Sequence, residues 1–303
     1  MKYQLKDYLA NTKPDWSKLS PGTYWMAVGF EKSGKTTAFS TFSPKGEDGV
    51  LFLDLEQGVR TDKAISVQIN SLNPPHDDNG NVILPINRGL KDSNGDPIPA
   101  LSMAEAVELV EQTWKDSGKT TLVIDTVDKL NLWCVEAAMH EIIAEEKTRK
   151  QPNLQILHAV SPEDIPYAGA YIRGREKVMN VVNMLLDIIK DNGILILISH
   201  LKKSVSITDG RDVVVKRVPA MPEGLASRLG YNAEAIVTLE VDQAGKHIAD
   251  FRGYSEVIMG TRIEPLHGRK FIWDKSGNNT LYNVIMNACQ RFQERKDATA
   301  TSP

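Results

Sequence analysis

The sequence predicts an α/β fold with a central, mostly parallel sheet, helices on both faces and added antiparallel strands toward the C-terminus. Three observations lead to this prediction. Short apolar runs alternate with helix-periodic segments over residues 23–199, as in parallel sheets that are covered on both faces. A glycine-rich loop follows the first apolar run and opens a helix. Beyond residue 201 the pattern changes to short strands.

Four apolar runs have the length of buried strands. They lie at residues 23–28, 50–55, 121–125 and 193–199. Helical periodicity occupies the segments that follow these strands or lie between them. The expected helices cover residues 35–42, 102–115, 127–146 and 170–190. In the second of these helices, Ser102 is the expected N-cap and Glu105 completes a capping box.

The remaining segments define the expected domain organisation. Residues 1–20 form an N-terminal arm, residues 21–277 the core, and residues 278–303 a C-terminal helix with a disordered tail, KDATATSP. Within the core, residues 71–100 hold two Asn-Gly pairs and five prolines, which predict an inserted loop or hairpin. Late strands are expected at 204–208, 212–218, 235–240, 247–252 and 256–259, and the last helix at 280–294.

Composition and charge indicate a globular protein without a membrane-spanning segment. The 303 residues are 41% hydrophobic and 25% charged, which is ordinary globular composition, and the net charge is only −3. No global field therefore draws the chain to nucleic acid, and any such contact needs a local basic patch. The start is polar and no apolar run reaches bilayer length, so we expect a cytoplasmic protein without membrane contact. Both cysteines, Cys134 and Cys289, are expected in the core.

The strongest motif is a phosphate-binding loop. Residues 29–36 read GFEKSGKT and satisfy the G-x-x-x-x-G-K-[ST] pattern in full. Its glycines let successive backbone N–H groups point at phosphate oxygens, and the helix dipole adds positive potential. The lysine reaches the β- and γ-phosphates and the threonine hydroxyl binds Mg²⁺. The expected nucleotide-binding residues are Gly29, Phe30, Glu31, Lys32, Ser33, Gly34, Lys35, Thr36 and Thr37.

Carboxylates end two of the predicted strands. Asp125 closes the strand TLVID, and we expect it to hold Mg²⁺ together with Thr36; the alternative is that it caps the next helix. Asp54 and Glu56 follow VLFLD, share a face by strand alternation, and offer a general base for the attacking water. Glu56 lies nearer the strand tip and is the preferred base. Asp128 is either a partner of these groups or a helix-start charge.

The fourth strand runs into a polar segment that begins with Ser199 and His200. His200 is placed to sense the γ-phosphate, or alternatively to cap backbone groups at the strand end. The other histidines have no zinc-ligand spacing. The expected catalytic residues are Lys35, Glu56 and His200.

Two basic clusters follow from the pattern. A hairpin turning at 208–210 and a helix start that joins Tyr171 to cations could bind single-stranded DNA, or could be solvated surface. The candidate DNA-binding residues are Arg173, Arg175, Lys202, Lys203, Arg211, Lys216 and Arg217. One cation could instead reach a neighbouring subunit's ATP site as a finger.

In the order GFEKSGKT, LFLDLEQG, LVIDT and ILILISHLKK, the chain resembles the RecA-like ATPases. It is most similar to the phage-encoded AAA-type members, the Sak-type proteins of single-strand annealing and recombination, over residues 20–260. The resemblance implies a RecA-type sheet and Mg²⁺-dependent ATP binding, with Lys35 and Thr36 on nucleotide and metal, Asp125 on the metal and Glu56 activating water. It also implies assembly into rings or filaments, with single-stranded DNA and a single-strand-binding protein as partners, in the host cytoplasm.

The sequence therefore supports four hypotheses about function. The leading hypothesis is a DNA-dependent ATPase of phage recombination or replication. The alternatives are a replicative helicase or its loader, a module that uses ATP to gate assembly, and a small-molecule P-loop kinase. The insert at 71–100 has no assigned role.

Overall fold

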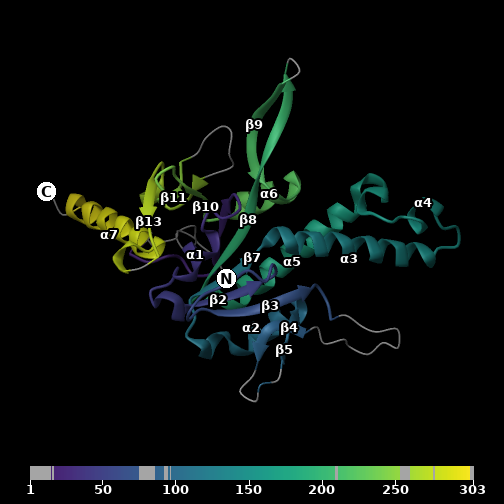
Figure 1. The fold of residues 1–303 in the computed structure, drawn as a ribbon, viewed down its shortest axis with the longest axis horizontal. Helices are drawn as coiled ribbons and strands as arrows, with labels where there is room; N and C mark the ends of the chain where they lie inside the picture. Colours follow the sequence, from purple (N-terminus) through teal and green to yellow (C-terminus); the bar gives the residue numbers. More distant parts are fainter. Residues whose placement is uncertain are drawn as a thin grey trace, which may run out of the picture.

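The structure is a computed structural model that describes residues 15, 17–74, 86–91, 95, 97–208, 211–252, 260–275 and 277–300. Within these residues an eleven-stranded, mostly parallel sheet lies between helical layers, which confirms the predicted α/β fold (Figure 1). The main strand order is β13-β11-β10-β1-β8-β7-β2-β3-β6, with β12 paired to β10 and β9 paired to β8.

Seven strands make the parallel part of the sheet. They are β1 (Thr23–Gly29), β2 (Val50–Asp54), β3 (Ile65–Ser71), β6 (Leu101–Ser102), β7 (Thr121–Asp125), β8 (Ile194–Thr208) and β10 (Ala235–Val241). Four others pair antiparallel with this sheet or its extensions. They are β9 (Arg211–Pro219), β11 (His247–Asp250), β12 (Gly260–Thr261) and β13 (Lys270–Trp273).

Helices cover both faces of the sheet. The α-helices are α1 (Lys35–Ser40), α2 (Met103–Ser117), α3 (Val127–Lys147), α4 (Leu154–Leu157), α5 (Gly169–Ile189), α6 (Glu223–Asn232) and α7 (Leu281–Ala300). Short 3-10 turns occur at η2 (Gly46–Gly49), η3 (Pro162–Asp164), η4 (Pro166–Ala168), η5 (Glu264–Leu266) and η6 (Gly277–Asn279).

Strand alternation builds one apolar core on each face of the sheet. Along β1, Tyr24, Met26 and Val28 join the core beneath α2, α3, α5 and α6. The intervening Trp25 and Ala27 join the second core with α1 and α7. Because successive side chains of a strand point to opposite faces, an uninterrupted apolar run is what a doubly covered strand requires. Both cysteines are buried, as expected.

The register brings the polar strand ends to a single edge. Gly29 at the end of β1 pairs with His200 of β8, and Asp54 of β2 pairs with Asp125 of β7. These strands are parallel, so their carboxyl ends meet at this edge, which is where ligands bind in open α/β sheets.

Several expectations need correction. Strand β8 does not end near Ser199 but continues as one strand to Thr208 and pairs with β9 (Figure 1). The last helix reaches Ala300, so residues 296–300 are helical and not disordered. Strands β3, β6, β12 and β13 and helix α6 were not predicted, because their sequences mix polar with apolar residues or are very short.

Other expectations are confirmed or lie outside the described residues. Ser102 and Glu105 form the predicted capping box, with Ser102 N donating to Glu105 Oε2 at 2.7 Å. In the insert, β4 (Ile86–Lys91) and β5 (Pro97–Pro99) pair antiparallel, as a hairpin does. The strand expected at 256–259, the turn residues 209–210 and most of the arm at 1–20 lie outside the described residues.

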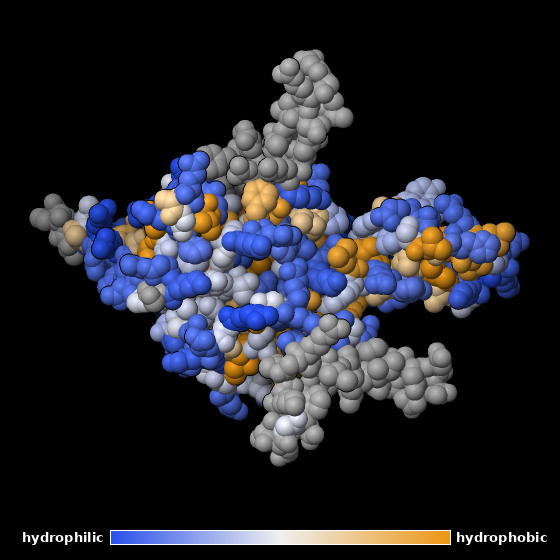
Figure 2. Space-filling view, viewed as in Figure 1, coloured by the Kyte–Doolittle hydropathy of each residue, from blue (hydrophilic) through white to orange (hydrophobic). Residues whose placement is uncertain are grey.

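Helices α3 and α5 extend together away from the sheet, and apolar side chains gather on this extension (Figures 1 and 2). Its exposed apolar residues include Leu154, Val160, Tyr167 and Ile172. No helix in the described part of the chain is both long and apolar enough to cross a bilayer.

Candidate functional site

The glycine-rich loop joins β1 to α1 at the polar edge of the sheet. Gly34 is the N-cap of α1 and has a φ of +85°, in the left-handed region that glycine adopts without strain. At Gly29 a Cβ atom would lie 2.6 Å from the carbonyl oxygen of Leu239, so the loop packs against β10 too closely for any side chain. Both glycines of the motif are therefore required by the backbone path.

Lys35 is buried beneath this loop. Its Nζ donates to the carbonyl oxygens of Gly29 and Phe30, each at 2.9 Å. Burial lowers the pKa of Lys35, although Asp125, Asp128 and Glu56 act in the opposite direction. The ammonium group is thus held inside the loop by two neutral acceptors, which a phosphate oxygen can replace with a stronger, charge-assisted hydrogen bond.

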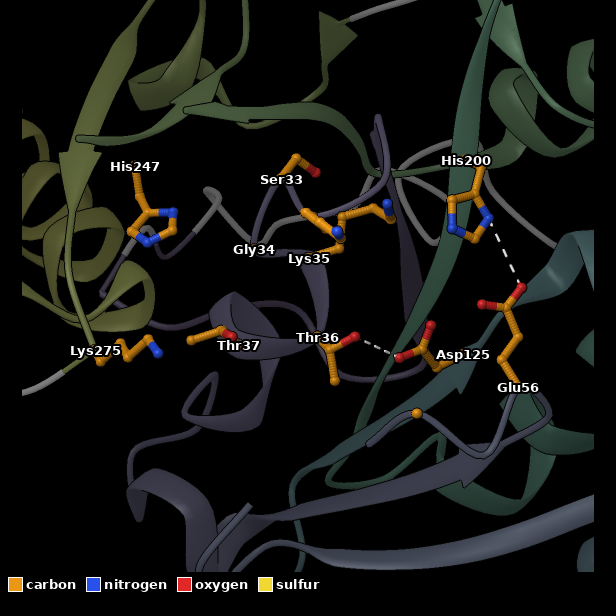
Figure 3. Close-up of a pocket in the computed structure, with 12 residues that line it drawn as sticks. Ser33, Gly34, Lys35, Thr36, Thr37, Glu56, Asp125, His200, His247 and Lys275 are labelled. Atoms are coloured by element: carbon orange, nitrogen blue, oxygen red, sulfur yellow. Dashed lines mark hydrogen bonds and ion pairs between the residues drawn. The ribbon is translucent and has the colours of Figure 1, made fainter. Parts of the chain in front are cut away.

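Thr36 and Asp125 meet across the site, as the metal prediction requires. Thr36 Oγ1 donates to Asp125 Oδ2 at 2.7 Å (Figure 3). Asp125 is 6% exposed, and burial raises its pKa to about 6, helped by the charges of Asp54 and Glu56 and opposed by the Thr36 hydrogen bond. A nearby cation would stabilise the ionised form of this buried carboxylate.

Asp54 and Glu56 have different surroundings. Asp54 is 1% exposed and accepts the backbone N–H groups of Glu56, Gly58 and Val59 at 3.0–3.2 Å. It fixes the loop after β2. Since β2 ends at Asp54, Glu56 lies beyond the strand and the expected sharing of a strand face does not apply.

Glu56 points toward His200 (Figure 3) and is oriented by a residue that sequence reasoning did not single out. Thr126 Oγ1 donates to Glu56 Oε1 at 2.9 Å. Thr126 follows Asp125 through a cis peptide bond and is the N-cap of α3. Its own position at a strand end, directly after a predicted metal ligand, is the signal that could have identified it. The Glu56 side chain keeps 41% of its surface exposed, so water can reach it.

His200 connects two carboxylates. Its Nδ1 lies 3.3 Å from Asp128 Oδ2 and 3.8 Å from Glu56 Oε1, and its backbone N donates to Asp128 at 2.6 Å. Ser199 Oγ donates to the other oxygen of Asp128 at 2.7 Å. The hydrogen bond to Asp128 raises the pKa of His200, against the effects of burial and of Lys35. Asp128 is therefore both a first-turn charge of α3 and a partner of the site.

These residues surround one cavity of about 370 Å³ (Figure 3). Of the predicted site residues, its lining includes Lys32, Ser33, Gly34, Lys35, Thr36, Thr37, Glu56, Asp125 and His200. Gly29, Phe30 and Glu31 lie in the loop but not in this lining. Three lining residues were not predicted, namely Gly58, His247 and Lys275. None of the three belongs to a sequence motif. His247 and Lys275 reach the loop only through the pairing of β11 with β10 and of β13 with β11.

The helical basic cluster is engaged with other parts of the fold. Arg173 makes two hydrogen bonds to Glu145 at 2.6 and 2.7 Å, and Lys177 pairs with Glu141 at 2.6 Å. These pairs join α5 to α3. Arg175 lies against α6, with its Nη1 2.9 Å from where a Cβ on Gly224 would be.

The hairpin cluster lies on the ribbon formed by β8 and β9. Lys202 is exposed, and Lys203 stands opposite Arg217 in the register. For Lys203, Arg211, Lys216 and Arg217 the structure describes the backbone but not the side chains, so only their positions along the ribbon are given. The ribbon rises from the edge of the sheet that carries His200 (Figure 1).

Comparison with known proteins adds to this geometry. The family described as AAA domain matches residues 23–263. No curated protein matches the chain. Among solved structures, the chain is similar to a KaiC-like protein from the hyperthermophilic archaeon Pyrococcus horikoshii OT3, with 15% identity over 86% of this chain and 88% of that chain and a TM-score of 0.38.

Proposed function

The chain belongs to the AAA domain family, and from that premise we propose that it binds ATP with Mg²⁺, hydrolyses it and acts on single-stranded DNA. The observation that carries the proposal is the convergence of Lys35, the Thr36–Asp125 pair and Glu56 on one cavity. Because the order of motifs resembles that of Sak-type proteins, we propose that this activity serves recombination or replication.

Nucleotide binding rests on the loop and its helix. Residues 32–36 line the cavity at the start of α1, where helix-end potential favours anions. Lys35 exchanges its two carbonyl acceptors for phosphate oxygens and neutralises charge between the β- and γ-phosphates.

The residues present fit a magnesium ion. Mg²⁺ prefers hard oxygen ligands and is usually held by one or two protein groups together with water and phosphate oxygens. The Thr36 hydroxyl and the Asp125 carboxylate supply such oxygens 2.7 Å apart, and a cation there would oppose the burial that raises the pKa of Asp125. When bound, the ion would neutralise charge that develops on the β- and γ-phosphate oxygens.

Hydrolysis follows from the position of Glu56. Its carboxylate accepts a proton from water as the water oxygen forms a bond to the γ-phosphorus, and the bond to the β-phosphate oxygen breaks to release ADP and phosphate. Thr126 holds Glu56 by one oxygen and leaves the other for water. His200, 3.8 Å from Glu56, is in position to respond to the γ-phosphate.

The DNA proposal is supported by continuity between the site and the basic ribbon. His200 and Lys202 lie two residues apart on β8, and the backbone register places Lys203, Lys216 and Arg217 just beyond them, with Arg211 at the far end of the ribbon. Arg173 is already neutralised by Glu145, so we place the DNA contact on the ribbon. We also propose self-assembly, since Glu56 is partly exposed and a cation from a neighbouring subunit could approach it.

The first experiment measures ATP hydrolysis with and without single-stranded DNA, and size-exclusion elution with a non-hydrolysable ATP analogue. We expect DNA to stimulate hydrolysis and the analogue to promote assembly. Lys35→Ala should abolish hydrolysis, while Lys115→Ala, on an exposed face of α2, should leave it unchanged. No hydrolysis under any condition would refute the ATPase proposal, and hydrolysis that no DNA stimulates would refute the DNA proposal.

A second experiment locates the DNA-binding surface. The double variant Lys202→Ala/Lys203→Ala should weaken binding to single-stranded DNA and reduce the dependence of affinity on salt, by roughly one unit of slope for each phosphate that is no longer neutralised. The control is Lys115→Ala/Lys150→Ala, which removes two exposed lysines elsewhere. Equal affinity and salt slope for both double variants would exclude the ribbon.

A further inference from the structure

The nucleotide cavity has a second end that the phosphate loop does not form. His247 of β11 and Lys275, which follows β13, line the cavity together with Gly34 and Thr37 (Figure 3). These two residues come from the antiparallel extension of the sheet. Neither the proposed hydrolysis nor the metal site uses them.

The arrangement of the loop gives the cavity a direction. Glu56, His200 and Asp125 lie on one side of Lys35, and His247 and Lys275 lie on the other (Figure 3). A triphosphate whose γ-phosphate faces Glu56 must leave the loop on the opposite side, past Thr37. The nucleoside end of the ligand therefore lies toward His247 and Lys275.

A polar atom at this second end lacks a partner. His247 Nδ1 is buried next to Gly34 and has no hydrogen-bond partner among the described residues. Buried polar groups in folded proteins nearly always have partners, so this nitrogen suggests that a ligand supplies one.

The histidine ring is also held in a fixed place. It stacks on Trp273 with centroids 4.6 Å apart and an angle of 26° between the planes. Gly34 accommodates the ring closely, since a Cβ there would lie 2.9 Å from His247 Nδ1. A ring fixed by stacking and set against the loop is preorganised for binding.

We propose that His247 and Lys275 bind the nucleoside end of the nucleotide, with His247 Nδ1 on a ribose hydroxyl and the Lys275 ammonium on the α-phosphate. An imidazole nitrogen can donate to or accept from a hydroxyl, while an ammonium suits a phosphate oxygen. In Figure 3 the Lys275 side chain points toward Thr37, and by the direction argued above the α-phosphate would leave the loop there. This inference rests on the proposed nucleotide binding and names the residues that distinguish a nucleotide from a bare polyphosphate.

Calorimetric titration tests the proposal with two probes, a non-hydrolysable ATP analogue and inorganic tripolyphosphate. His247→Ala should weaken binding of the analogue about tenfold and leave tripolyphosphate binding unchanged, because the hydrogen bond that it removes is to the ribose. Lys275→Ala should weaken binding of both probes. Lys246→Ala, which removes the neighbouring exposed lysine, should change neither.

His247→Asn guards against a folding defect, because its amide places a polar atom near the position of Nδ1 and should restore most of the affinity. Unchanged analogue binding by His247→Ala, or equal weakening with both probes, would overturn the ribose contact. Unchanged binding by Lys275→Ala would overturn the phosphate contact. If wild-type protein binds neither probe, or if Lys35→Ala binds both normally, the proposed function itself fails.

Discussion

The contact between Gly34 and His247 permits a quantitative test of the loop's construction. Gly34→Ala places a Cβ 2.9 Å from His247 Nδ1 and 3.0 Å from its Cε1, in a backbone with φ +85°. The left-handed conformation costs an alanine about 1–2 kcal/mol. Crowding in a packed site costs about 1–3 kcal/mol more, and the ring cannot move aside freely because it stacks on Trp273. The total destabilisation should be about 2–5 kcal/mol.

His247→Ala separates the two parts of this cost. It removes the crowding but leaves the backbone strain, so Gly34→Ala should cost only about 1–2 kcal/mol in the His247→Ala background. The assay is urea unfolding of the four proteins without nucleotide, followed by circular dichroism. Gly268→Ala is the matched control, because Gly268 has φ +64° and nothing within 4 Å of its Cβ position. Additive effects of Gly34→Ala and His247→Ala would refute the contact.

Three further predictions follow from the same packing. Asp54→Ala leaves three backbone N–H groups without their acceptor, and should lower the free energy of unfolding by about 2–3 kcal/mol in urea titrations; an unchanged midpoint would contradict this. Gly174→Ala should destabilise the protein by about 1–3 kcal/mol in the same assay, although alanine has the better helix propensity, because its Cβ would lie 2.8 Å from Val135 Cα. His200 should titrate above its ordinary pKa of about 6.5 in NMR spectra and return toward that value in Asp128→Asn. Since its folded pKa is raised, the stability difference between wild type and Asp128→Asn should be full below about pH 6.5 and shrink as pH rises through the folded pKa; a difference that grows with pH would contradict the assignment.

The sequence was sufficient for the parallel strands β1, β2, β7 and β10 and for the first part of β8, because doubly covered strands need uninterrupted apolar runs. It did not predict β3 (Ile65–Ser71), whose only fully buried residue is Ile69 and whose serine, glutamine and asparagine residues hide the strand pattern. Strand pairing with β2 on one side and β6 on the other stabilises this segment. Its conformation therefore depends on neighbours that lie far away in the sequence.

The site shows the same division between local and distant information. Lys35 and Thr36 belong to a contiguous motif whose spacing alone predicts their proximity, and Asp125 follows from its strand end. Strand alternation, by contrast, could not separate Asp54 from Glu56, because the chain leaves the strand at Asp54 and Gln57 adopts a φ of +56°. Once the loop turns there, one carboxylate binds loop amides and the other faces the cavity.

His247 and Lys275 were beyond the reach of sequence reasoning for a different physical reason. Neither belongs to a motif, and each reaches the cavity only because β11 pairs with β10 and β13 pairs with β11. The pairing extends the sheet on the side of β1 away from β8, so these strands form a wall next to the phosphate loop.

Strand β8 gives the site a direct structural connection to the basic ribbon. It pairs with β1 up to His200, and its pairing with β9 begins at the next residue, where Leu201 stands opposite Pro219. No unpaired residue separates the two ladders, so the strand has no hinge between the sheet and the ribbon. The backbone N–H of His200 is also bound to Asp128 at 2.6 Å, which ties this junction to the start of α3 and, through Thr126, to Glu56. A displacement of the ribbon by a bound strand of DNA should therefore reach His200 and the base that it faces, which is the physical basis for expecting DNA to alter the rate of hydrolysis.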